Sequence, residues 1–191
     1  MAEEALLTMR GICKYFPGVR ALENVDFTLH SGEVHALVGE NGAGKSTLIK
    51  VLTGVHAKDG GKIAMEGRPI SPSSPLEAMK CGISTVYQEV NLCPNLSVAE
   101  NIFIGREPKK AGGIDWKTRK LLEGLDVHID VTMAVENYSI AIQQMIAIAR
   151  AVDVDAKVLI LDEPTSSLDE EETQRLFAVV RKLKAQGLGV I

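Results

Sequence analysis

A glycine-rich segment between an apolar run and a helix-forming segment constrains the fold of this 191-residue chain most strongly. Residues 39–46 read Gly-Glu-Asn-Gly-Ala-Gly-Lys-Ser and fit the pattern G-x-x-x-x-G-K-[ST]. The run Val34–Val38 predicts a strand before it, and residues from Lys45 to about Thr53 predict a helix that Gly54 ends. This order of elements is typical of a loop that binds phosphate through its backbone N–H groups.

Two side chains at the end of this segment are expected to contact a nucleotide directly. Lys45 would reach the β- and γ-phosphates, and Ser46 would ligate Mg²⁺. The candidate nucleotide-binding residues here are Gly39, Glu40, Asn41, Gly42, Ala43, Gly44, Lys45, Ser46 and Thr47. The alternative is a glycine-rich turn that matches the pattern by chance, and the flanking strand and helix signals argue against it.

A second strand-like run ends in two adjacent carboxylates. Val158–Leu161 is apolar throughout, which is typical of a buried parallel strand, and Asp162 and Glu163 follow it directly. Open α/β sheets bind ligands at the carboxyl ends of their strands. We therefore expect Asp162 to hold Mg²⁺ and Glu163 to polarise the water that attacks the γ-phosphate. The alternative is an acidic helix N-cap region without a catalytic role.

Composition and charge argue against several classes of protein. The net charge of −4 gives no electrostatic basis for binding nucleic acid, so we expect no nucleic-acid partner. The cysteines, Cys13, Cys81 and Cys93, are too few and too scattered for a disulfide framework or a C-x-x-C site. No run approaches the roughly 18 to 20 apolar residues that cross a bilayer, and the acidic amino terminus does not match a signal peptide. We expect a soluble chain that meets a membrane only through a partner subunit.

The strand signals predict an α/β core with an antiparallel β layer. Runs over residues 6–38, broken at Ser31-Gly32, predict a hairpin whose second strand leads into the glycine-rich loop. Residues 62–65 and 68–70 predict a second strand pair, and residues 82–87 predict a buried strand.

The helix signals lie mainly in the middle of the chain. Asp115 is expected to cap a helix running to about Leu125, and Ser139 to cap one running to about Val152. Asp169 would cap a further helix with an acidic first turn and a basic last turn, which suits the helix dipole. The buried stripe of that helix would consist of Leu176, Val179, Val180 and Leu183.

These patterns together predict one domain over residues 1–191. Residues 1–87 and 153–191 would form the α/β core, and residues 88–152 would form a mainly helical subdomain. Because Leu188–Ile191 looks like the start of another strand, we expect the chain to be a carboxyl-terminally truncated piece of a longer protein.

The motifs resemble the ATP-binding cassette (ABC) family, and the resemblance covers essentially the whole chain. The matching residues are the loop at 39–46, Gln88, Asp162 with Glu163, and Ser167–Asp169. The resemblance implies an ATPase with a P-loop NTPase fold, in which a RecA-like parallel core carries an antiparallel β layer and a helical subdomain. ATP and Mg²⁺ are the implied cofactors. Gln88 would ligate Mg²⁺, sense the γ-phosphate and link the site to a membrane subunit, and Asp169 would contact a partner cassette.

The resemblance also implies an aromatic residue stacked on the adenine. Phe16 falls at the matching position, and Tyr15 is the close competitor. For either residue, plain packing in the core is the alternative interpretation.

Within the family, the chain is similar to the first cassette of the tandem-cassette ATPases of bacterial sugar importers. The similar stretches are Phe16–Leu22, Gly39–Val55, Val86–Leu92 and Pro94–Pro108, of which the last is most like galactofuranose importers. This similarity implies import of galactofuranose or a related monosaccharide, energised at the cytoplasmic face of the bacterial inner membrane. The implied partners are transmembrane permease subunits, a second ATP-binding cassette and, indirectly, a periplasmic sugar-binding protein.

One segment departs from the family pattern. Where Leu-Ser-Gly-Gly-Gln is expected, the chain has Tyr138–Ile142, which keeps Ser139 but replaces the glycines with Ile140 and Ala141. Their side chains should hinder the approach of this segment to the γ-phosphate of a partner cassette. We therefore hypothesise an asymmetric dimer, in which the loop and carboxylates of this chain form a competent site while its altered signature serves a weakened one.

The switch histidine of the family would fall beyond Ile191, so we expect this chain to hydrolyse ATP poorly. The histidines that it does contain, His30, His35, His56 and His128, are expected to be ordinary surface or strand residues. Two alternatives stay open: a non-hydrolysing nucleotide sensor, against which Glu163 argues, and a soluble ABC ATPase not linked to transport, against which the acidic charge argues.

Overall fold

The computed structural model describes residues 5–87, 91–106 and 113–191. Within them the chain forms two compact units. The first contains the residues up to Thr85 together with Ala156–Ile160 and Lys184–Ile191, and the second contains Val86–Asp155 and Leu161–Leu183. The second unit thus takes in residues that the sequence pattern groups with the α/β core, and the domain division expected from the sequence stays a prediction.

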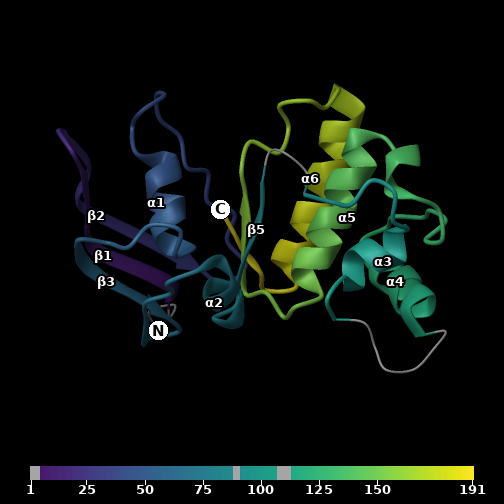
Figure 1. The fold of residues 1–191 in the computed structure, drawn as a ribbon, viewed down its shortest axis with the longest axis horizontal. Helices are drawn as coiled ribbons and strands as arrows, with labels where there is room; N and C mark the ends of the chain where they lie inside the picture. Colours follow the sequence, from purple (N-terminus) through teal and green to yellow (C-terminus); the bar gives the residue numbers. More distant parts are fainter. Residues whose placement is uncertain (1–4, 88–90, 107–112) are drawn as a thin grey trace. The chain divides into compact units, whose positions relative to one another are not determined.

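A four-stranded antiparallel sheet in the order β2-β1-β3-β4 supports the first unit (Figure 1). Its strands are β1 (Ala5–Phe16), β2 (Val19–His30), β3 (Gly60–Met65) and β4 (Arg68–Ile70). The antiparallel layer and its β3–β4 pair are confirmed. The prediction of a hairpin around Ser31-Gly32 is wrong. Instead, β2 pairs with β1 across the two-residue turn Pro17-Gly18, where Gly18 has a φ of 76°.

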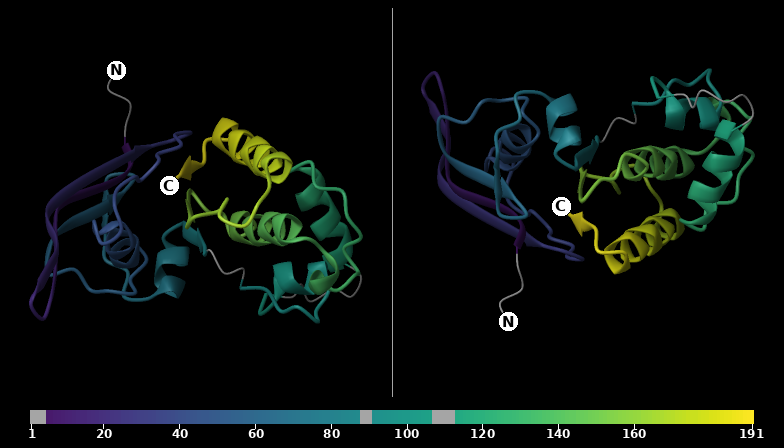
Figure 2. Two further views of the ribbon diagram at one scale, coloured as in Figure 1. Left: turned by 90° about the horizontal axis from the view of Figure 1, so that it is seen from above. Right: turned by 90° about the horizontal axis from the view of Figure 1, so that it is seen from below.

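One helix lies against this sheet (Figure 2). It is α1 (Lys45–Leu52), which buries Leu48, Val51 and Leu52, and it agrees with the helix expected after the glycine-rich loop. On the sheet the core includes Leu7, Met9, Ile12, Leu29 and Ile63. The helix that begins at the loop is therefore anchored on the antiparallel layer. The first unit also contains α2 (Pro75–Lys80), which Ser74 caps.

A second, three-stranded sheet has the order β5-β6-β7. Its strands are β5 (Ile83–Val86), β6 (Val158–Leu161) and β7 (Gly189–Val190), so the strands expected near 82–87, 158–161 and 188–191 are confirmed. β6 and β7 are parallel. β5 runs the same way as β6, because Val158 N–H donates to the Gly82 carbonyl and Asp162 N–H donates to the Val86 carbonyl.

The strand expected at Val34–Val38 does not form. Val34 makes an isolated parallel bridge to Val190, and His35 N–H donates to the Val190 carbonyl at 2.8 Å. A strand depends on the N–H and C=O groups of a neighbour. β7 offers only two residues, and Val38 is 88% exposed. The apolar run therefore reaches the glycine-rich loop as an irregular segment.

Helices dominate the second unit. They are α3 (Val98–Phe103), α4 (Gly113–Glu123), η1 (Val135–Asn137), α5 (Ile140–Val152) and most of α6 (Glu170–Ala185). The helices α3, α4 and α5 pack on one another. The expected cap at Asp115 is wrong, since α4 begins two residues earlier and Asp115 lies in its first turn, where a carboxylate still suits the dipole.

The other two caps are confirmed. The Ser139 hydroxyl accepts the Ile142 N–H at 3.4 Å at the start of α5. The Asp169 carboxylate accepts the Glu172 N–H at 2.8 Å, and the Glu172 carboxylate accepts the Asp169 N–H at 3.3 Å. The buried stripe of α6 is the one expected from the sequence. All three cysteines are free, and no helix in the described ranges has the length and hydropathy to cross a membrane.

Gly54, just beyond the end of α1, has no room for a side chain. Its φ is 73°, and an added Cβ would lie 2.6 to 2.8 Å from backbone atoms of Pro72 and Ser74. We expect Gly54→Ala to lower the free energy of unfolding by about 2 to 4 kcal/mol, because left-handed strain and overpacking add. Gly18→Ala is the matched control, since Gly18 has a φ of 76° with open space around it. It should cost about 1 kcal/mol. Urea unfolding of both variants measures the difference, and equal losses would contradict the steric explanation.

Candidate nucleotide-binding site

Glycine is required in the loop by both conformation and space. Gly42 and Gly44 have φ values of 85° and 89°, which residues with side chains rarely adopt. A Cβ at Gly44 would come within 2.7 Å of the Ala21 carbonyl oxygen and 3.0 Å of the Leu22 side chain. The loop therefore lies directly against β2, and its shape depends on this close approach.

Positive groups converge in the same loop. The Lys45 ammonium donates to the carbonyl oxygens of Gly39 at 2.5 Å and Glu40 at 3.0 Å, and Ala43 N–H donates to the Glu40 carbonyl at 3.1 Å. Gly44 occupies the N-cap position of α1 and offers no side chain to accept the first-turn N–H groups. These groups have no partner within the helix. The first-turn N–H groups of α1 are thus available to an anion, which would compete with the two carbonyls for the ammonium.

The residues beside Lys45 fit a magnesium ion held together with phosphate. Ser46 is exposed in the first turn of α1, where its hydroxyl can serve as a hard oxygen ligand. Across the described ranges, no three His, Cys, Asp or Glu side chains gather as a metal cluster. Mg²⁺ takes few protein ligands and relies largely on phosphate oxygens and water.

The two carboxylates follow β6, as expected. Asp162 is half-buried, and its N–H donates to the Val86 carbonyl at 3.0 Å, so β5 fixes its backbone. Glu163 is exposed and has a φ of 47°, a left-handed conformation that is unfavourable for a residue with a side chain. Among the described residues, Asn24, Glu66, Asp126 and Asp155 also combine a side chain with a positive φ, so the role of Glu163 stays a prediction. The loop belongs to the first unit and these carboxylates to the second.

The remaining predicted site residues are placed as follows. Gln88 lies outside the described residues. Ser139 is exposed at the start of α5, and Asp169 is exposed at the start of α6, where it caps its own helix. Beside Ser139, Ile140 is 51% exposed whereas Ala141 is 4% exposed. Of the two side chains expected to hinder a partner's phosphate, only that of Ile140 is therefore at the surface.

The two candidate aromatic residues are both at the surface. Phe16 is 38% exposed and Tyr15 is 45% exposed, so plain core packing is wrong for both. The choice between them as the residue that stacks on adenine stays a prediction. The Asp59 carboxylate accepts the backbone N–H of Tyr15. The sequence did not indicate this contact, because Asp59 lies 44 positions from Tyr15 along the chain.

Glu33 is a second residue that the sequence did not single out. Its carboxylate accepts the His30 N–H at 2.7 Å, and its Oε1 lies 3.0 Å from His35 Nδ1. The backbone carbonyl of Glu33 also accepts the Val190 N–H at 2.8 Å. Glu33 and His35 therefore fix the start of the segment that leads to the glycine-rich loop.

The stability of this attachment should depend on pH. The pKa of Glu33 lies below its ordinary value of 4.5, chiefly because the His30 N–H donates to the carboxylate, and burial opposes the shift. A carboxyl whose pKa is lowered by folding stabilises the fold above its ordinary value and loses that contribution as the pH falls through the lowered value. Below pH 4.5 we expect the parent chain to lose its stability advantage over Glu33→Gln. Thermal unfolding of both chains from neutral to acid pH measures this, and a pH-independent difference would contradict it.

A family comparison agrees with this arrangement of loop, strands and helices. Residues 22–166 match the family model described as ABC transporter, and the chain therefore belongs to this family. The resemblance drawn from the motifs is confirmed.

Within this family, the chain is similar to ATP-binding proteins of sugar transporters. The chain is 53% identical over 191 residues to the ribose import ATP-binding protein RbsA 1 of Rubrobacter xylanophilus, covering 97% of this chain and 38% of that protein. It is 51% identical over 193 residues to the galactofuranose transporter ATP-binding protein YtfR of Escherichia coli strain K12, covering 98% and 39%. The chain thus spans about two fifths of the length of these curated relatives.

A solved structure has the same fold. The ADP conformation of MJ1267, an ATP-binding cassette of an ABC transporter, superposes with a TM-score of 0.88 at 29% identity, covering 97% of this chain and 79% of that one. The P-loop NTPase fold expected from the sequence is therefore confirmed.

Proposed function

We propose that this chain is the first ATP-binding cassette of a sugar importer's ATPase, and that it binds and hydrolyses Mg-ATP to energise import. The observation that carries the proposal is the loop at 39–46, in which the Lys45 ammonium and the first-turn N–H groups of α1 are available to a polyphosphate. The high identity to import ATP-binding proteins supports the link to transport.

The names of the relatives support a monosaccharide as the class of the transported substrate. The names of the two relatives give ribose and galactofuranose at nearly equal identity, and we keep galactofuranose or a related monosaccharide as the proposal. The proposed partners are transmembrane permease subunits, a second ATP-binding cassette and, indirectly, a periplasmic sugar-binding protein. The place of action would be the cytoplasmic face of the bacterial inner membrane.

Each candidate side chain would have its own role in binding or hydrolysing Mg-ATP. On binding, Lys45 would exchange the carbonyls of Gly39 and Glu40 for the β- and γ-phosphates, while N–H groups of residues 39–47 hold the phosphate chain. Ser46, Asp162 and Gln88 would hold Mg²⁺, which neutralises phosphate charge when bound. Glu163 would polarise the attacking water, and Gln88 would sense the γ-phosphate. Asp169 would contact the partner cassette.

The altered signature supports an asymmetric dimer. Ser139 stays exposed at the start of α5, but Ile140 projects beside it where the family has glycine. The site that this segment serves across the dimer should therefore be the weaker one. Equal hydrolysis at both sites of the intact protein would contradict the asymmetry. We also propose that the chain alone turns ATP over slowly.

The alternative function is a cassette that binds nucleotide without hydrolysing it, and the position of Glu163 directly after β6 argues against it. The two functions differ in turnover. A chain that binds Mg-ATP but shows no hydrolysis in a complete transporter would be a sensor.

A chimera tests the link to transport. The chain would replace the matching 193 residues of the E. coli galactofuranose transporter ATP-binding protein, in cells that lack their own copy. We expect the chimera to support galactofuranose uptake, and Lys45→Ala within it to abolish uptake. Lys50→Ala is the matched control, since Lys50 lies in the last turn of the same helix. A folded chimera that binds Mg-ATP but supports no uptake would contradict a role in import.

A further inference from the structure

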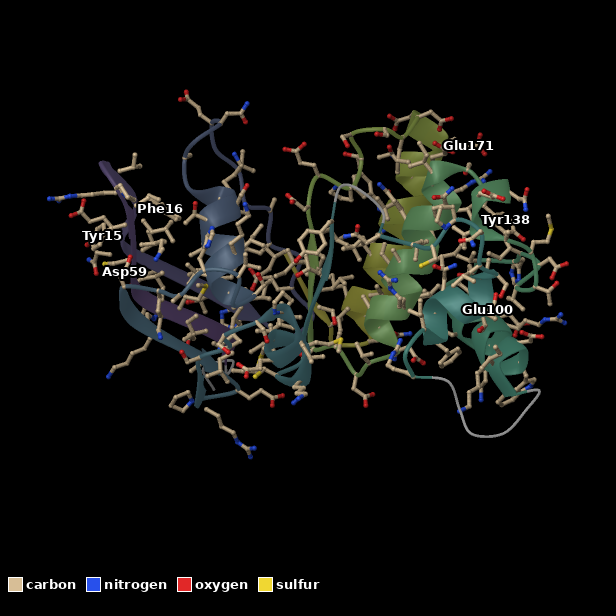
Figure 3. The ribbon with its side chains drawn as sticks, viewed as in Figure 1. Tyr15, Phe16, Asp59, Glu100, Tyr138 and Glu171 are labelled. Carbon is tan, nitrogen blue, oxygen red and sulfur yellow. The ribbon has the colours of Figure 1, made fainter. Side chains whose placement is uncertain are left out.

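The end of the β1–β2 hairpin carries an aromatic ring that polar neighbours hold in place. Phe16 ends β1, and Figure 3 shows it near Tyr15 and Asp59. The rings of Phe16 and His56 meet edge to face, with centroids 5.3 Å apart and an interplanar angle of 75°. The Lys14 ammonium lies 5.4 Å from the centroid of the Phe16 ring. The ring is half-exposed, so these neighbours rather than a closed core determine its position.

Asp59 holds the three residues that precede Phe16. Its N–H donates to the Cys13 carbonyl at 2.9 Å, its Oδ1 accepts the Lys14 ammonium at 3.3 Å, and its Oδ2 accepts the Tyr15 N–H at 2.6 Å. The pKa of Asp59 lies below its ordinary value, chiefly because of the bond from the Tyr15 N–H, so the side chain is charged at neutral pH. A single carboxylate thus fixes the backbone immediately before the ring.

The segment that contains Asp59 also connects the hairpin end to the loop helix. His56, which contacts the Phe16 ring, donates its N–H to the Lys50 carbonyl at 3.0 Å in the last turn of α1. The first turn of α1 carries Lys45. Residues 56–59 therefore tie the hairpin end to the helix that begins at the phosphate-binding loop.

We propose that Asp59 is a positioning residue for the nucleotide base. By holding Lys14 and Tyr15, it sets the Phe16 ring where an adenine can stack while the phosphates occupy the loop. The proposal rests on the proposed function, because it presupposes ATP bound at residues 39–47. A base stacked on an aromatic ring contributes strongly to binding, whereas the phosphate contacts come from other residues. Loss of the Asp59 side chain should therefore weaken the binding of ligands that carry a base and leave the binding of ligands without a base unchanged.

Calorimetric titration with two ligands separates these effects. Mg-ATP carries a base, and Mg-tripolyphosphate carries the phosphates alone. We expect Asp59→Ala to weaken Mg-ATP binding by about tenfold and to leave Mg-tripolyphosphate binding within about twofold, since only stacking is disturbed. Asp59→Asn keeps an oxygen that can accept the Tyr15 N–H and should recover most of the affinity.

Asp26 offers a matched control within the same hairpin. Its Oδ1 accepts the Gly11 N–H at 2.7 Å, and its Oδ2 lies 3.5 Å from the Arg10 guanidinium. Asp26→Ala therefore removes a comparable pair of contacts farther from the hairpin turn, and it should change neither affinity.

Several outcomes would overturn the proposal. Equal weakening of both ligands by Asp59→Ala, or weakening of Mg-ATP by Asp26→Ala, would reveal a general effect on the hairpin. If Lys45→Ala abolishes Mg-ATP binding while Phe16→Ala and Asp59→Ala leave it unchanged, the proposed function stands and the positioning role falls. A folded parent chain that binds neither ligand would overturn both.

Discussion

Lys45→Ala should weaken the binding of Mg-ATP by at least about a hundredfold, since two hydrogen bonds from a charged donor to phosphate are lost. In the free chain the Lys45 ammonium already donates to the carbonyls of Gly39 and Glu40, so it lies within the loop. Removing it deletes the positive charge that would meet the β- and γ-phosphates and also leaves the two carbonyls without this donor. Isothermal titration of both chains with Mg-ATP measures the effect.

Lys50→Ala serves as the matched control for this experiment. Lys50 is exposed in the last turn of the same helix, so its loss changes the net charge by the same amount without touching the loop. We expect its affinity for Mg-ATP to stay within about twofold of the parent, because screened surface charges contribute little. Comparable weakening by both variants would show that the loop does not hold the phosphates specifically.

Glu163→Gln should lower the rate of ATP hydrolysis by about a hundredfold or more, as expected for loss of a general base. Glutamine keeps the size of the side chain but cannot take a proton from the attacking water. The affinity for Mg-ATP should change little, because the phosphates are held elsewhere. The assay uses the chimera with the galactofuranose transporter ATP-binding protein, with the second cassette of the chimera kept inactive so that turnover reports on this site.

The control for Glu163 comes from the neighbouring acidic helix start. Glu170 is exposed in the first turn of α6, and its carboxylate accepts the Gln174 amide at 3.0 Å. Glu170→Gln should leave turnover within about twofold, because an exposed first-turn charge interacts only weakly with its surroundings. If Glu163→Gln and the parent hydrolyse ATP equally fast, Glu163 is not the general base of this reaction.

Features encoded in neighbouring residues were the most predictable from the sequence. The spacing of glycines before Lys45 predicted the loop and α1, since positive φ at Gly42 and Gly44 is a local property. The stripe and cap of α6 followed in the same way, because helix periodicity and the contact from Asp169 act within a few residues.

Features that depend on distant partners were less predictable. The run Val34–Val38 has the composition of a strand, but a strand forms only where a neighbour offers its backbone groups, and Val190 offers one bridge. The pairing of β1 with β2 likewise depends on register, which composition does not specify. The contacts of Asp59 join positions 44 and more residues apart, and no local pattern indicates them. The roles of Gln88, Asp162 and Glu163 stay predictions because they concern bound ligands.

The two bonds from Lys45 to its own loop have a consequence for ligand selection. A ligand that enters the loop competes with the carbonyls of Gly39 and Glu40 for the same ammonium. We expect a single inorganic phosphate to replace these bonds with a similar number of contacts and therefore to gain little binding free energy. A triphosphate would make further contacts with the backbone N–H groups, so we expect it to bind more tightly than a single phosphate. We therefore expect the resting loop to favour a triphosphate over free phosphate before any contact with the base is made.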